Sequence, residues 1–105
     1  MGTLNMSFNS VIIPAVVLFD SGVSHCFIAT SYTRHHGLDV SATPTPYLID
    51  APGAEVLINQ CVSRASLVIN EIPFGANLLV MNSKGIDVIL RMNWLTKNKA
   101  VIDCA

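Results

Sequence analysis

One short segment has the residue types that could carry out chemistry. Asp20, Ser21 and Gly22 directly follow the apolar residues 16–19. Burying an ionised carboxylate is costly, so an aspartate at the end of such a run must be hydrogen-bonded, paired with another charge or used in a reaction. Ser21 supplies a hydroxyl, and glycine lets another backbone approach closely. Asp-Ser-Gly is also common turn chemistry, and taken alone these three residues favour an ordinary exit from a strand.

The other residues that could bind a metal or act as nucleophiles are spread along the chain. Their spacing matches no closed zinc pattern. Adjacent strand residues point to opposite faces, which disfavours a nucleophilic pair made of neighbouring His and Cys. Three widely spaced cysteines are not a disulfide framework and favour reduced thiols. We therefore expect neither a metal nor another cofactor. The residues concerned are His25, Cys26, His35, His36, Cys61 and Cys104.

The composition is that of one folded, strand-rich domain. The chain has 105 residues, of which 51% are hydrophobic and 12% charged. That is enough apolar material for one core, in a chain too short for two. Valine and isoleucine together outnumber leucine by about two to one, and β-branched residues favour strands. We therefore treat residues 1–105 as a single domain.

The charge balance argues against two classes of partner. The formal net charge is −1, with six basic and seven acidic residues, so the chain has neither a basic nucleic-acid footprint nor a polybasic membrane patch. Its longest apolar stretch, residues 11–19, is too short for a bilayer, which takes roughly 20 helical residues. Low charge with a mean hydropathy of +0.53 predicts instead that the free domain associates with itself or a partner.

Turn-forming residues divide the chain into many short strands with little helix. Gly37 is suited to end a helix over residues 27–36, and Asn93 can cap a second one through about residue 98. This pattern predicts a mostly β fold that closes on itself. The expected strands cover residues 11–19, 43–49, 56–62, 65–69, 76–81, 88–90 and 101–104.

Three segments, taken together and in order, resemble one protein family. Residues 19–28 read Phe-Asp-Ser-Gly-Val-Ser-His-Cys-Phe-Ile, which resembles the active-site loop of retropepsin-like aspartic proteases, above all those encoded in plant gypsy-class retrotransposons. Residues 51–55, Ala-Pro-Gly-Ala-Glu, are similar to the flap region of that family. Residues 86–95, Ile-Asp-Val-Ile-Leu-Arg-Met-Asn-Trp-Leu, are similar to a later family segment. The resemblance spans nearly the whole chain.

The resemblance implies a fold, an activity and a set of site residues. The fold is a small closed β barrel of the retropepsin type with one or two short helices. The activity is that of an aspartic endopeptidase that matures a retrotransposon polyprotein, in the cytoplasm or within retrotransposon particles. Because this chemistry needs two facing carboxylates and the chain has one such loop, the expected partner is a second copy. The implied roles are catalysis by Asp20, support by Ser21 and Gly22, and flap or substrate contact by Ala51, Pro52, Gly53 and Ala54.

Several departures from the family pattern keep other functions open. Arg91 stands where the family has a glycine beside the catalytic loop, and Val23 and Ala54 replace smaller residues. Because a long cation there would clash or pair with Asp20, we expect Arg91→Gly to be more stable and more active. The chain also stops about where the family continues into a dimerisation strand. The alternatives are a catalytically degenerate domain that dimerises or binds peptides, and a β module that adds a peptide strand at an exposed edge.

Overall fold

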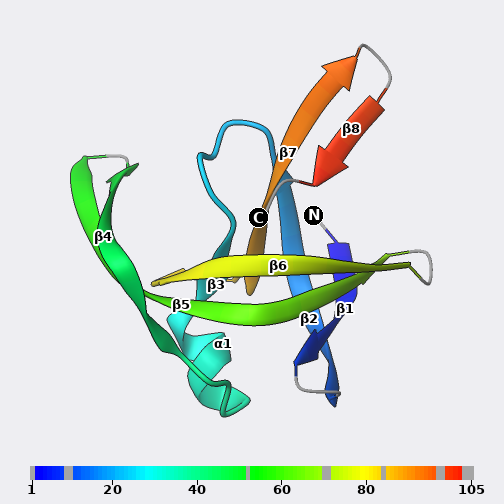
Figure 1. The fold of residues 1–105 in the computed structure, drawn as a ribbon, viewed down its shortest axis with the longest axis horizontal. Coiled ribbons are helices and arrows are strands. Elements are labelled where there is room, and N and C mark those ends of the chain that lie inside the picture. Colours follow the sequence, from blue (N-terminus) through cyan, green and yellow to red (C-terminus); the bar gives the residue numbers. More distant parts are fainter. Residues whose placement is uncertain are drawn as a thin grey trace.

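A computed structural model describes residues 2–8, 11–51, 53–69, 72–83, 85–96 and 99–102. Within these residues the chain forms eight strands and one short helix (Figure 1), which confirms the prediction of a mostly β fold. In chain order the elements are β1 (Gly2–Phe8), β2 (Val11–Asp20), β3 (Phe27–Ala29), α1 (Thr30–His35), β4 (Ser41–Ala51), β5 (Ala54–Ile69), β6 (Ile72–Met81), β7 (Val88–Thr96) and β8 (Lys99–Ile102).

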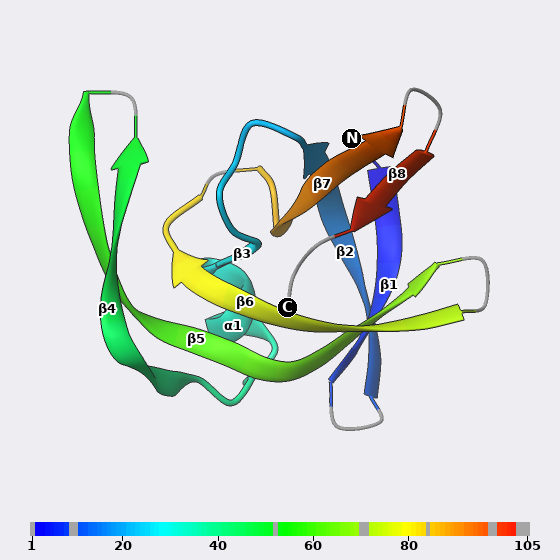
Figure 2. The same cartoon turned by 45° about the horizontal axis from the view of Figure 1, so that its top comes forward.

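The strands form one strongly curved sheet. Its order is β1-β2-β7-β3-β6-β5-β4, and β8 pairs with β7 outside this path. β1 also pairs with β5, so the sheet curls back until its first strand meets the sixth in the order. Figure 2 shows the β4–β5 hairpin projecting beyond the curled part. β4 lies outside this ring, at an edge of the described sheet, so the predicted closure holds for the six strands from β1 to β5 in the sheet order and does not include β4.

The first predicted helix exists but is shorter than expected. α1 ends at His35, and Gly37 follows with φ +61°, as expected for a glycine at the end of a helix. The helix begins only at Thr30, because residues 27–29 form β3 and pair with β6 and β7. No helix in the described part of the chain is long and apolar enough to cross a membrane.

The prediction of a second helix is wrong for the residues that the structure describes. Residues 93–96 continue β7, which pairs with β8 through Asn93↔Val101 and Trp94↔Ala100. The strand that begins at Val88 therefore continues with its backbone groups paired across the ladder, and this pairing outweighs the capping preference of asparagine. Residues 97 and 98 lie outside the described residues, as do residues 103 and 104 of the predicted last strand.

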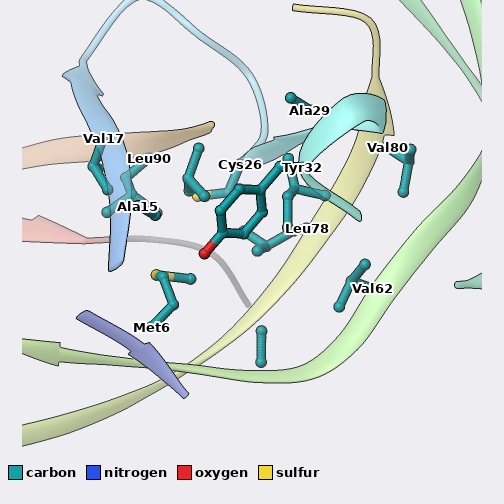
Figure 3. Packing of buried hydrophobic residues seen from close by; sticks show 13 residues of the cluster. Met6, Ala15, Val17, Cys26, Ala29, Tyr32, Val62, Leu78, Val80 and Leu90 are labelled. Carbon is teal, nitrogen blue, oxygen red and sulfur yellow. The ribbon is translucent and has the colours of Figure 1, made fainter. Parts of the chain in front are cut away.

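The main hydrophobic core lies inside the curl of the sheet. Met6, Val17, Leu78 and Leu90 are fully buried and come from β1, β2, β6 and β7 respectively. Figure 3 shows the ring of Tyr32, from α1, among these side chains. The core thus fixes β2 and β7 side by side, and these two strands carry Asp20 and Arg91.

Tyr32 gives this core a measurable pH dependence. Its side chain is 5% exposed, and its hydroxyl donates a hydrogen bond to the Pro14 carbonyl oxygen at 3.1 Å. Burial, with a smaller contribution from the negative charge of Asp87, raises the pKa of Tyr32 from 10.0 to about 12. The folded state therefore favours the neutral phenol, and this stabilisation is complete below pH 10 and lost as pH rises toward 12.

We expect Tyr32→Phe to be less stable than the parent protein by about 1 kcal/mol at neutral pH, because the Pro14 carbonyl loses its donor. The difference should narrow between pH 10 and pH 12, where the parent alone loses the contribution of the Tyr32 hydroxyl. Urea unfolding of both proteins across that range measures it. A difference that stays constant with pH would contradict this account.

Candidate active site

β2 carries Asp20 to the end of the sheet. The strand lies parallel to β7, with Val17 opposite Val88 and Asp20 opposite Arg91. Val17 and Val88 are both fully buried, so the first of these pairs faces the core. Asp20 is the last residue of β2 and is half-buried. The strand predicted over residues 11–19 is therefore what holds the carboxylate in place.

The turn after β2 explains the need for glycine at position 22. One carboxylate oxygen of Asp20, Oδ1, accepts a hydrogen bond from the Gly22 backbone N–H at 2.8 Å. A Cβ at position 22 would lie 3.2 Å from the same oxygen, closer than ordinary van der Waals contact. Gly22 therefore lets its backbone approach and orient the carboxylate. The ordinary turn expected from Asp-Ser-Gly is found, and it leaves Asp20 half-buried.

Asp87 holds β2 through hydrogen bonds to Val16, a role that was not predicted from the sequence. Its Oδ2 accepts the Val16 N–H at 2.8 Å, and its own N–H donates to the Val16 carbonyl at 2.9 Å. Its carbonyl accepts the Ala29 N–H at 2.8 Å. One residue thus joins β2, the start of β7 and the end of β3. The available signal was an acidic residue directly before the apolar residues 88–90.

Arg91 lies beside Asp20 in the β2–β7 ladder. Residues in register on neighbouring strands project from the same face of a sheet, so the two side chains share a face. The backbone N–H of Arg91 donates to the Cys26 Sγ at 3.1 Å. Arg91 is part of a regular ladder, so glycine has no conformational advantage there. Its register opposite Asp20 is compatible with the expected crowding of the loop, but the backbone argument for glycine does not apply.

The cysteines differ from the expectation of reduced thiols. Cys26 is 2% exposed and disulfide-bonded, whereas Cys61 is a free thiol. Wide spacing in the sequence therefore did not exclude a disulfide at Cys26. Cys104 lies outside the described residues. In the described part of the chain, no three His, Cys, Asp or Glu residues are grouped to hold a metal.

The predicted flap residues lie at the tip of the β4–β5 hairpin. Ala51 ends β4 and Ala54 begins β5, and the two are paired in register. Gly53 has φ +80°, a left-handed conformation that glycine adopts without strain. Pro52 lies outside the described residues. Figures 1 and 2 both show this hairpin and the loop after β2 rising on the same side of the sheet. The flap or substrate-contact role of the tip residues stays a prediction.

The β4–β5 hairpin packs, through the paired residues Tyr47 and Ile58, against the segment that follows the loop after β2. Phe27 of β3, Ile58 of β5 and Leu79 of β6 form a small buried cluster. Val23, from the loop, and Tyr47, from β4, pack against it. This cluster is apolar and connects the hairpin to the residues that come directly after Asp20.

These elements give a carboxylate on a Gly-containing turn, at the end of a buried strand and beside a projecting hairpin. That arrangement is what aspartic proteolysis requires of one half of its site. A family model described as retroviral aspartyl protease matches residues 4–105. The chain therefore belongs to the retroviral aspartyl protease family, and its retropepsin-like fold agrees with the sheet seen here. No curated protein matches the chain closely enough to count as a relative.

Proposed function

We propose that the chain is one half of a homodimeric aspartic endopeptidase that cleaves the polyprotein of a retrotransposon of the gypsy class. The observation that carries this proposal is the position of Asp20, which the Gly22 N–H orients at the end of a strand fixed by the core. The family match supports the same chemistry. A retrotransposon particle or the cytoplasm is the place where we expect it to act.

The proposed mechanism needs two copies of Asp20. Two facing carboxylates share one proton, since like charges about 3 Å apart do not both ionise readily. The ionised one acts as a general base on a water molecule, and the protonated one as a general acid toward the carbonyl of the scissile peptide. The second copy of the chain supplies the second carboxylate. The Ser21 hydroxyl is proposed to brace the two loops across the twofold axis.

The β4–β5 hairpin is proposed to cover the bound peptide. A covering hairpin excludes water from the reaction and holds the substrate in place. The tip residues, with Gly53 in a left-handed turn, allow the hairpin to bend sharply over an extended chain. The apolar cluster at its base would keep it attached to the loop that carries the catalytic residue.

A catalytically degenerate domain of the same fold is the second candidate. It is favoured by one observation, namely that Arg91 lies opposite Asp20 in the β2–β7 ladder. In that case the protein would dimerise or bind peptides without cutting them. The two candidates share the fold and differ only in turnover, so a single pair of measurements separates them.

Sedimentation equilibrium at micromolar concentration and cleavage of a peptide mixture test the proposal together. We expect a dimer, and cleavage that falls more steeply than the protein concentration when the dimer is diluted toward dissociation. A dimer that cuts no peptide would support the degenerate candidate. A species that stays monomeric at high concentration would overturn the enzyme, because a monomer has only one Asp20.

A further inference from the structure

The imidazole of His25 joins the catalytic loop to the β4–β5 hairpin. Its ring centroid lies 5.1 Å from that of Tyr47 on β4, with an interplanar angle of 72°. It also lies 6.5 Å from Phe27, edge-on at 69°. Aromatic pairs favour edge-to-face contacts at such separations. His25 is half-buried and is only five residues beyond Asp20, so a contact with Tyr47 connects the site to the hairpin directly.

The ring of His25 is itself held in place. Its Nδ1 lies 2.9 Å from the Oγ of Ser24, within hydrogen-bonding distance. Phe27, which is 4% exposed, supports it from β3. Its orientation is therefore set from its own side of the contact, by groups that belong to the loop and to β3. A ring held in this way can fix the position of Tyr47, on β4, relative to the loop.

Tyr47 is the residue at which the projecting part of the hairpin begins. The β4–β5 ladder is regular from Tyr47↔Ile58 to Ala51↔Ala54, and again at Ala42↔Gln60, but its register shifts between these parts. Residues 43–46 of β4 face the single residue 59 of β5 across that shift. They include Pro44 and Pro46, which lack the N–H that a ladder needs. The upper hairpin, residues 47–58, is thus joined to the sheet through an irregular segment on its β4 side.

We propose that His25 is a positioning residue that sets the angle of the upper hairpin relative to Asp20. The His25 ring contacts Tyr47, the first residue beyond the irregular segment, and leaves the hairpin tip free to move when substrate binds. Removing the ring takes away the contact between the loop and Tyr47, while Ile58 and its partly buried neighbours on the hairpin still pack on the small cluster. We expect the upper hairpin then to sample a wider range of positions. This inference rests on the proposed function for its effect on catalysis, but its effect on the hairpin does not.

Hydrogen exchange of the full chain tests the contact without any substrate. We expect His25→Ala to speed exchange of amides within residues 47–58 by about tenfold, while the amides of β2 and β6 keep their rates. His25→Phe keeps a ring against Tyr47 and should stay within about twofold of the parent. Tyr47→Ala should resemble His25→Ala, and combining the two should add little. His35→Ala, which removes an exposed imidazole at the end of α1, is the matched control and should change nothing in the hairpin.

Steady-state cleavage adds the catalytic readout. We expect His25→Ala to raise KM about fivefold with kcat within about twofold, and His25→Phe to restore KM, since the hairpin acts on binding. Unchanged exchange in residues 47–58, or equal acceleration in β2 and β6, would overturn the positioning role. If the parent cuts no peptide, the proposed function fails, yet the exchange measurement still decides the role of His25.

Discussion

Asp20→Asn should lower peptidase activity at least about 1000-fold, because an amide can neither accept a proton from water nor donate one as a carboxylic acid does. The fold should survive. The amide oxygen can still accept the Gly22 N–H that Asp20 Oδ1 accepts at 2.8 Å, so the turn after β2 keeps its hydrogen bond. We therefore expect the free energy of unfolding to change by less than about 0.5 kcal/mol. Peptide cleavage and urea unfolding of the same preparations measure both effects.

Asp39→Asn provides the matched control. Asp39 is an exposed carboxyl between α1 and β4, outside the loop and the hairpin, so the same chemical change there should leave cleavage within about twofold. Mixing parent protein with an excess of Asp20→Asn should also suppress cleavage, because mixed dimers hold one carboxylate. Undiminished cleavage by Asp20→Asn would show that another group, or a contaminating protease, does the work.

Arg91→Ala should raise both self-association and turnover, each by about tenfold, which corresponds to about 1.4 kcal/mol. Arg91 shares a face with Asp20 in the β2–β7 ladder, and under the proposed function the loop of a second copy approaches this face. Each copy brings one such cation, so a dimer places two of them near the twofold axis, where like charges repel. Alanine removes the length and the charge, and it leaves the main-chain N–H that donates to Cys26 Sγ in place.

Arg91→Gly distinguishes the side chain from the backbone. In the regular ladder a glycine should be less stable than an alanine by about 0.5–1 kcal/mol, contrary to the stability gain expected from the sequence, while turnover should rise as it does with alanine. Sedimentation equilibrium, peptide cleavage and urea unfolding of the two variants report the three quantities. If neither variant associates more tightly nor cuts faster, Arg91 is an accommodated surface residue and does not obstruct the site.

The strand end and turn at Asp20 could be predicted from the sequence because their parts are adjacent. An apolar run, one aspartate and one glycine lie within seven residues, and local chemistry alone requires a strand that ends in a polar turn. The turn at Gly53 and the end of α1 before Gly37 could be predicted for the same reason. Each depends on the conformational preference of a residue at its own position.

Each of the features that could not be predicted depends on a contact with a residue of another element. Asp87 holds Val16 across 71 positions, and His25 meets Tyr47 only because β4 returns beside the loop. The strand over residues 93–96 exists through its pairing with β8, which outweighs the local preference of Asn93 for a helix cap. Local sequence patterns do not indicate which elements pair with one another.

The contacts of Asp87 also determine when the site can form during synthesis. β2 leaves the ribosome early, but the carboxylate that holds Val16 and the strand that pairs with Asp20 are made about 70 residues later. At about 5–20 residues per second, that interval lasts several seconds. Until then Asp20 lies on a strand that lacks its β7 neighbour and the hydrogen bonds of Asp87. Under the proposed function, a polyprotein that is still being translated up to residue 87 carries the catalytic aspartate but not the protease.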